Sequence, residues 1–434
     1  PSSGTALELG TSGDTITVPT GAGLTVVDEV KTNKVSPATG TAFALGDSGD
    51  TFTVPSGATI VNSGTATGFG ITAASFRPNV DPLVINGDMA VAQRSTSVAS
   101  ITTAGYHTVD RWKTGIVTAG TWTQTQEALT ADEAFEDGFS TALKMDCTTA
   151  DASLAAADYL RLQTIWEGQN LQLLKIGSST AEKMTLSFWV KATKTGTNIA
   201  NLYEETANRQ CSQSYTVDTT NTWEKKVINF PADTSGGIDD DNTASLMLTF
   251  FVAAGTNYTS GTLATTWASS SNVNRAVGQV NNADSTSNNF HITGVQLEVG
   301  EYTSSTIPPF QHESYGNNLA RCQRYFLFTG GGSLYQHHGV GVEVSATAAY
   351  NTIPLTCPMR ASPTYTARNI SSLKIYDGTG EHTMTSIGSV NYSSNTSLLN
   401  SAVNCSGGGL TDGNGIIIYS SNDSDSGFLI SAEL

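Results

Sequence analysis

Apolar and polar residues alternate with a period of two along much of the chain, which is the pattern of strands buried on one face. In the run Met184–Ala192 every second residue is apolar, and Trp189 lies with the intervening polar residues. The runs Leu246–Val252 and Phe290–Val299 predict two further core strands, the second with a kink at Gly294. Such strands, joined by long loops of Ser, Thr and Asn, indicate an antiparallel sandwich of jelly-roll type.

One short helix interrupts the strand pattern. Between residues 314 and 326, Leu319, Cys322 and Phe326 recur at the spacing of a helical apolar stripe, shortly after two prolines. We interpret this helix as a connector between domains. Beyond it, short apolar runs alternate with Gly-containing turns to the end of the chain, which predicts a second, smaller β domain.

The N-terminal region contains an internal repeat. Residues 4–19 and 40–55 are identical at twelve of sixteen positions and lie 36 residues apart. Each copy alternates apolar residues with turn residues, which predicts short strands. Hairpins of this size are marginal alone in water, so we expect other chains to complete them in an intertwined stalk, most simply a threefold fibre. A flexible Gly/Thr linker is the alternative.

Together these patterns predict an all-β protein in four parts. In chain order they are a β-hairpin repeat stalk, a jelly-roll β-sandwich, a connector helix and a small β tip domain, at residues 1–75, 76–310, 311–328 and 329–434. All six tryptophans fall in the sandwich. The Ser/Thr/Asn-rich stretch from Thr256 to Asn289 is expected to run over its surface or to be disordered in part.

Charge and composition exclude several classes of function. The 434 residues include 21 Lys and Arg against 38 Asp and Glu, a net charge of −17. Nucleic-acid binding requires a basic footprint, so we expect no nucleic-acid partner. No stretch approaches the roughly 18 apolar residues of a spanning helix, so we expect no membrane insertion. The five cysteines are widely spaced, which favours reduced thiols in a protein made in a cytosol.

Three local motifs resemble tail fibres and other appendage proteins of marine bacteriophages. The first runs from Leu83–Met89 to Val109–Trp112, and the second from Ile292–Gly300 to Cys322–Tyr325. These two are similar to the opening and the end of a carbohydrate-binding-module-like jelly roll and its exit helix. The third, Phe428–Leu434, is similar to the last strand of many fibre tips.

The resemblance implies a virion structural protein, a homotrimeric tail fibre or spike that attaches to host surface glycans. It also implies assembly in the host bacterial cytoplasm, a place on the virion surface, and contact with other virion proteins through the N-terminal region. A capsid-attached fibre or decoration protein is one alternative, and a fibre enzyme that degrades polysaccharide is another. The sequence has no H-E-x-x-H, G-x-S-x-G or P-loop motif, and we expect a protein that is not an enzyme.

Sugar binding requires aromatic faces that stack on pyranose rings and polar groups that bind hydroxyls. Trp189 is the best aromatic candidate, because its parity places it on the non-core face. Tyr203, Arg209 and Gln213 follow in the next loop and strand, and Trp122 is a second aromatic candidate among Thr and Gln residues. The alternative is that these are core or subunit-interface residues. The acidic composition favours a neutral or amino sugar over a phosphorylated one.

The resemblance also implies a structural calcium ion, held near the first and last strands of the jelly roll. Asn86, Asp88 and Glu298 are the positions that match. Calcium takes six to eight oxygen ligands, so these three supply part of a shell. An ordinary turn and a solvated glutamate are the alternative. We expect no other cofactor.

Overall fold

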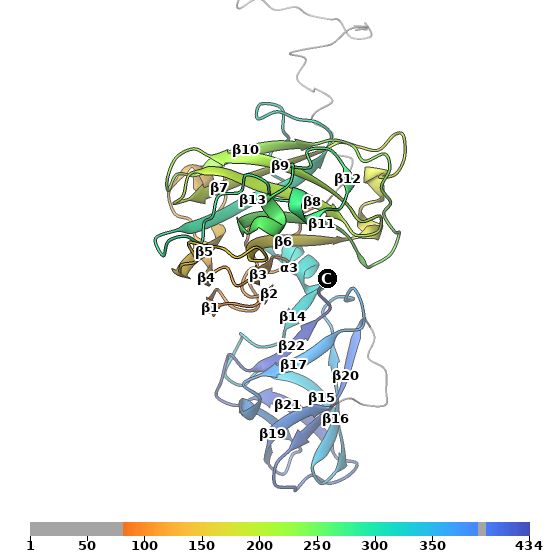
Figure 1. Ribbon diagram of the computed structural model, residues 1–434. Helices are drawn as coiled ribbons and strands as arrows, with labels where there is room; N and C mark the ends of the chain where they lie inside the picture. The colour runs from red at the N-terminus through yellow and green to blue at the C-terminus, as the bar shows by residue number, and fades with distance from the viewer. Residues whose placement is uncertain (1–80, 389–395) are drawn as a thin grey trace, which may run out of the picture. The chain divides into compact units, whose positions relative to one another are not determined.

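The computed structural model describes residues 81–388 and 396–434, so the sequence repeats and the predicted stalk lie outside the described residues. The described residues belong to one unit, distinct from Pro1–Phe69. They form two stacked antiparallel sheets and a smaller β-barrel (Figure 1). The predicted all-β class is confirmed. All five cysteines are free. Within this part of the chain, no helix combines the length and the apolar character needed to cross a membrane.

The jelly roll consists of a six-stranded sheet, sheet A, and a seven-stranded sheet, sheet B. The strands of sheet A are, in spatial order, β1 (Ser97–Ile101), β4 (Thr121–Ala128), β5 (Thr141–Thr149), β13 (Asn289–Val299), β7 (Met184–Ala192) and β10 (Glu224–Phe230). Those of sheet B are β12 (Ala268–Ser269), β9 (Arg209–Val217), β8 (Gly196–Glu204), β11 (Ala244–Ala254), β6 (Tyr159–Glu167), β3 (Lys113–Val117) and β2 (Gly105–Tyr106).

The core lies between the two sheets, where the alternate apolar side chains of each strand pack against those of the other sheet. The Phe188 ring of β7 contacts the Phe250 ring of β11 edge to face, with centroids 4.8 Å apart, and the centroid of the Trp112 ring lies 6.2 Å from that of Phe250. The predicted kink in β13 is confirmed. Gly294 has a φ of +59° and a Cβ there would lie 2.6 Å from the Phe139 ring, so only glycine fits.

The excursion that starts at Thr256 follows the surface of the sandwich, as predicted. It contains the short helix α2 (Thr256–Thr259) and packs on the outer face of sheet B. Ile199 of β8 and Phe251 of β11 project outward there and are covered by Ala276 and Tyr258 of the excursion. This apolar contact holds the polar segment against the sheet. On the other sheet, the short helix α1 (Glu133–Glu136) belongs to a second covering segment.

The connector helix α3 (Tyr315–Gln323) begins at Ser314, whose hydroxyl accepts a hydrogen bond from the Asn317 amide. It is followed by a closed barrel whose strands, in order, are β15 (His337–Ser345), β16 (Ala348–Pro354), β20 (Leu398–Cys405), β19 (Glu381–Gly388), β18 (Leu373–Tyr376) and β21 (Gly415–Ser420). A three-stranded sheet of β14 (Phe326–Phe328), β22 (Gly427–Ser431) and β17 (Thr364–Arg368) accompanies the barrel.

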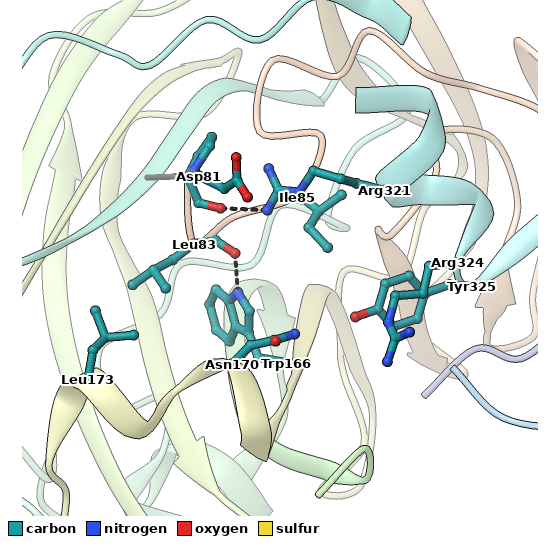
Figure 2. Close-up of a pocket in the computed structure, with 10 residues that line it drawn as sticks. Asp81, Leu83, Ile85, Trp166, Asn170, Leu173, Arg321, Arg324 and Tyr325 are labelled. Atoms are coloured by element: carbon teal, nitrogen blue, oxygen red, sulfur yellow. Dashed lines mark hydrogen bonds between the residues drawn. The ribbon is translucent and has the colours of Figure 1, made fainter. Parts of the chain in front are cut away.

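A cavity of about 350 Å³ lies beside α3 (Figure 2). Both of its arginines and its tryptophan have partners within the fold. Arg324 pairs with Glu167 through two hydrogen bonds of 2.8 and 2.6 Å, and Arg321 pairs with Glu313 at 2.6 Å. The Trp166 indole donates to the Leu83 carbonyl at 2.7 Å. We therefore assign this cavity to the anchoring of the helix and not to ligand binding.

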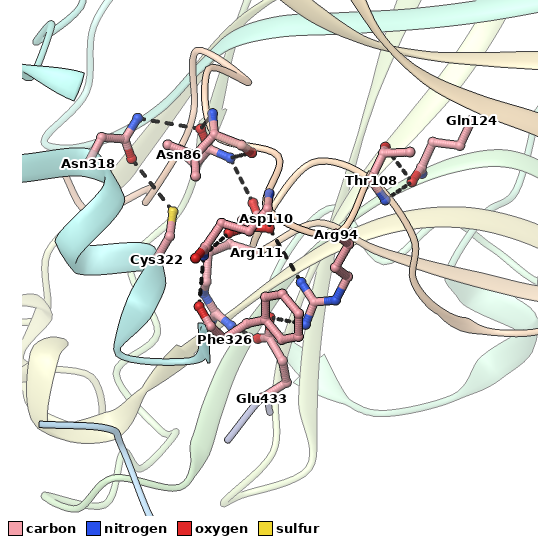
Figure 3. A network of polar contacts seen from close by, with 12 residues as sticks. Asn86, Arg94, Thr108, Asp110, Arg111, Gln124, Asn318, Cys322, Phe326 and Glu433 are labelled. Carbon is pink, nitrogen blue, oxygen red and sulfur yellow. Dashed lines mark hydrogen bonds and ion pairs between the residues drawn. The ribbon is translucent and has the colours of Figure 1, made fainter. Parts of the chain in front are cut away.

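The three sequence motifs meet in one polar network (Figure 3). Arg111, which is 1% exposed, stacks its guanidinium on the Tyr325 ring at 3.5 Å and forms an ion pair with Glu433. Arg94 joins the same network, pairing with Glu433 at 3.1 Å and with Asp110 at 3.4 Å. The motif residues therefore connect the jelly roll, the residues after α3 and the end of the chain.

Candidate functional site

Trp189 lies on the outer face of sheet A, as its parity predicts. Its neighbours across the sheet are Thr293 of β13 and Lys225 of β10. The ring is half-buried against an apolar cluster that includes Trp223, and its indole donates to the Asp137 carboxylate at 3.0 Å. One side of the ring is therefore already engaged by the protein.

Tyr203 lies on the outer face of sheet B, on the opposite side of the sandwich from Trp189. Arg209 and Gln213, which the sequence predicts to bind sugar together with Tyr203, form hydrogen bonds within the fold. Arg209 forms two hydrogen bonds, of 2.7 and 2.9 Å, with the buried carboxylate of Asp233. Gln213 donates to the Thr265 carbonyl at 3.0 Å. The structure therefore does not bring the predicted residues into one site, and a sugar-binding role stays a prediction for Trp189 and Tyr203.

Trp122 requires a correction. Its side chain is fully buried, and its indole donates to the Ala119 carbonyl at 2.7 Å. No face of the ring is open to a sugar. The polar Gln124, two residues on, has the same parity and is also buried, because it bonds to Thr114 and Thr108 inside the sandwich. Because a polar glutamine occupies a core position of this strand, the sequence pattern did not identify Trp122 as a core residue.

The three predicted calcium ligands do not meet at one point, which corrects that ligand set. The Asn86 amide is buried and bonds to Val91 through both its oxygen and its nitrogen. Gly87 lies beside Val295 of β13, whereas Glu298 lies three residues further on, about 10 Å along the strand. Ligands of one calcium ion lie 2.3–2.6 Å from it. In the described chain, no group of three His, Cys, Asp or Glu is arranged to hold a metal.

The barrel carries an open surface pocket of about 290 Å³, which we call the tyrosine pocket. It is lined by Tyr335, His337, Tyr376, Glu381, Ile417 and Tyr419. Tyr335 is 59% exposed and Tyr376 is 41% exposed, which is unusual for large aromatic residues. The pocket therefore presents aromatic surface to solvent beside a carboxylate and an imidazole.

Strand register explains why these side chains gather. His337 of β15 lies opposite Tyr419 of β21, and Ile417 of β21 lies opposite Tyr376 of β18. Tyr376 in turn lies opposite Glu381 of β19. The alternate residues of β18 and β21 fill the barrel interior, which forces these side chains outward.

The polar groups of the pocket are positioned by each other. The Tyr419 hydroxyl donates to the Glu381 carboxylate. Partial burial, together with this carboxylate, raises the pKa of Tyr419 to about 12, so the hydroxyl stays a donor. The Tyr335 and Tyr419 rings lie 6.5 Å apart at an angle of 31°. This arrangement can stack on a sugar ring and accept hydrogen bonds from its hydroxyls.

Sequence reasoning missed this pocket. The parity of each short strand, such as Leu373–Tyr376, does place its tyrosine opposite the core residues. Closure of the barrel makes β15, β21, β18 and β19 neighbours. Local sequence patterns do not predict which strands become neighbours. The signal that the sequence offered was the alternation along the short strands of the tip domain, which places their tyrosines on the outer face.

The same barrel yields a pH prediction. His338 is buried against Phe428 and its Nδ1 lies 2.9 Å from the Thr329 hydroxyl. Burial lowers its pKa from 6.5 to about 4. The unfolded chain therefore takes up a proton first as pH falls, so the stabilisation is complete above pH 6.5 and is lost between pH 6.5 and 4. Over this range we expect the native chain to lose about 2–3 kcal/mol more unfolding free energy than His338→Gln, and His337→Gln to lose as much as the native chain. Urea unfolding at several pH values measures it, and equal profiles for the native chain and His338→Gln would contradict the assignment.

Comparisons of this chain with known proteins show only weak similarity. No family model matches the chain, and no curated protein matches it. Among solved structures, it is similar to the enzymatically active domain of tailspike protein 4 of bacteriophage CBA120, with 12% identity, a TM-score of 0.26, and coverage of 50% of this chain and 21% of that one. The chain thus spans about a fifth of that tailspike domain's chain.

Two other solved structures cover about half of this chain. One is a protein of Bacteroides thetaiotaomicron assigned to sugar binding, with 14% identity, a TM-score of 0.27, and coverage of 50% of this chain and 100% of that one. The other is the family 11 carbohydrate-binding module of a cellulosomal cellulase of Clostridium thermocellum, with 13% identity, a TM-score of 0.24, and coverage of 48% and 98%. At these TM-scores, none of the likenesses says what this chain binds.

Proposed function

We propose that this chain is a carbohydrate-binding structural protein of a phage virion, a homotrimeric tail fibre or spike that attaches to host surface glycans. The tyrosine pocket is the observation that carries the proposal. Its exposed aromatic rings, one carboxylate and one imidazole are the groups that hold a sugar by stacking and hydrogen bonding.

The distribution of exposed apolar residues supports the tip domain as the binding part. Among the described residues, nine large hydrophobic side chains are exposed, and five of them belong to the barrel region. These five are Leu334, Tyr335, Val340, Val342 and Tyr376. Exposed apolar patches on soluble proteins commonly mark interaction sites. Three such sites on one trimer would gain avidity from their effective concentration, even with weak single contacts.

The trimer and its place on the virion rest on the sequence. The repeats at residues 4–19 and 40–55 favour a stalk completed by other chains, which would contact other virion proteins. Free thiols are typical of proteins assembled in a reducing cytoplasm. Antibody labelling of intact virions tests the location. We expect label on the tail, whereas label on the capsid would overturn the tail assignment in favour of a decoration protein.

We propose a binder and not an enzyme. Glycoside hydrolysis commonly uses two carboxyl groups about 5–9.5 Å apart, and Glu381 is the one carboxyl group among the residues that line the tyrosine pocket. We expect no new reducing ends when the protein is incubated with host capsule or lipopolysaccharide. Release of reducing ends would contradict the proposal and favour a polysaccharide-degrading fibre.

A further inference from the structure

Two arginines on the outer face of sheet B form no ion pair with a carboxylate of the described residues. Six of the nine arginines in the described residues form ion pairs with Asp or Glu, and Arg360 donates to three backbone carbonyls. Arg161 and Arg275 do neither, although the chain carries many more acidic than basic residues. This pair is therefore a local exception to the charge pattern of the protein.

The fold brings the two side chains to the same part of the outer face of sheet B, near Phe251. Arg161 of β6 lies directly opposite Phe251 of β11. Arg275 reaches the same ring from the excursion, with its guanidinium 5.9 Å from the Phe251 centroid. Arg161 stacks at 4.4 Å over Tyr159, and Arg275 lies 5.0 Å over Tyr203. Two like charges thus lie near each other among aromatic rings.

Neither guanidinium group is paired with a carboxylate of the described residues. Arg275 is 7% exposed, and it donates hydrogen bonds of 2.8 and 3.2 Å to the neutral amide oxygen of Asn201. Burial and the charge of Arg161 lower the pKa of Arg275 to about 10, while Glu205 acts on it only through space. The Nε atom of Arg161 is buried and has no hydrogen-bond partner among the described residues. A buried cation of this kind is ordinarily matched by an anion.

The neighbouring strand leaves room for the Arg161 side chain. Gly115 of β3 lies opposite Arg161, and a Cβ at this position would lie 2.8 Å from its Nε. Lys113, two residues earlier, has the same parity and adds a third positive charge to this face. Tyr258 closes the aromatic surroundings by packing edge to face on Tyr159 at 5.3 Å.

We propose that Arg161 and Arg275 bind the carboxylate of an acidic sugar of the uronic-acid class. The planar guanidinium fork matches a carboxylate, and the flanking tyrosine rings favour a carboxylate carried on a sugar ring. This is a second binding site, in the jelly roll, and it does not depend on the tyrosine pocket of the barrel. It reverses, for this face alone, the expectation that the acidic chain prefers neutral or amino sugars.

The test uses the full chain and one pair of probes, oligogalacturonate and its methyl ester, which differ in the carboxylate charge. We expect the acid to bind at least tenfold more tightly than the ester by calorimetry. Arg161→Gln should abolish this difference. Lys191→Gln is the matched control, because it removes one positive charge from the outer face of sheet A, where Lys191 lies 4.9 Å over Trp223. Equal affinities of the native chain for acid and ester, or an equal loss in both variants, would overturn the proposal.

Two further variants separate binding from folding. Arg161→Lys keeps the charge but lacks the fork, so a partial loss of acid preference is expected with unchanged thermal unfolding. Gly115→Ala should displace Arg161 and reduce the preference in the same direction; retention of the full preference in both variants would contradict the site. The titrations are repeated in a Tyr419→Ala background. If the acid preference persists there, the jelly-roll site stands whether or not the tyrosine pocket binds sugar.

Discussion

Replacing Glu433 with glutamine is expected to lower the free energy of unfolding by about 3–5 kcal/mol. Glu433 is the carboxylate partner of Arg111, which is almost wholly buried, and it also pairs with Arg94. Removing its charge leaves the Arg111 guanidinium buried without an anion. Urea unfolding at neutral pH, extrapolated to water, measures the change.

The matched control is Glu301→Gln. Glu301 pairs with Lys183 at 2.6 Å, but both side chains are more than half exposed. Exposed pairs contribute about 0–1 kcal/mol, so this variant should unfold almost as the native chain does. The double variant Arg111→Met/Glu433→Met should recover much of the loss, because an apolar pair carries no desolvation cost. Equal effects of Glu433→Gln and Glu301→Gln would contradict the assigned role of this network.

Local patterning predicted the strands but did not place every predicted site residue. The parity of Met184–Ala192 placed Trp189 correctly on the outer face, because alternation is a property of one strand. Trp122 failed because Gln124 is a buried polar residue whose partners come from other segments. The calcium ligands failed because the Asn86 side chain bonds to its own turn. The contacts that decide the place of Trp122 come from other segments, whereas those of Asn86 lie within its own turn.

Neither the tyrosine pocket nor the arginine pair could be predicted from local sequence patterns. The tyrosine pocket is assembled by β15, β18, β19 and β21, which barrel closure makes neighbours. Arg161 and Arg275 come from a strand and from the excursion, more than a hundred residues apart in the chain. The overall negative charge favoured a neutral sugar, yet two arginines that form no ion pair among the described residues lie on one face. Average composition does not predict local electrostatics.

The motifs that carry the family resemblance have a structural role in the described chain. Arg111 of the first motif, Tyr325 of the second and Glu433 of the third lie in one buried network. Such motifs identify how the parts are joined. Binding specificity would then lie in surfaces outside the motifs, such as the tyrosine pocket.

The second large effect is expected in the tyrosine pocket. Tyr335→Ala and Tyr419→Ala should each weaken sugar binding about tenfold, and the double variant about a hundredfold, because each removes an aromatic face and its hydroxyl. Tyr419→Ala also releases Glu381 from its hydrogen-bond donor. Tyr335 is largely exposed, so its substitution should leave the unfolding midpoint unchanged.

The affinity of the full chain for the host's purified surface polysaccharide, measured by calorimetry, tests the central claim most directly. The comparison is between the native chain, the variant Tyr335→Ala/Tyr419→Ala, and Tyr315→Ala as control. Tyr315 is 61% exposed on α3, outside the pocket. We predict that the double variant loses about a hundredfold in affinity while Tyr315→Ala binds as the native chain does. Undiminished binding by the double variant would contradict the assignment of the tyrosine pocket as the glycan site.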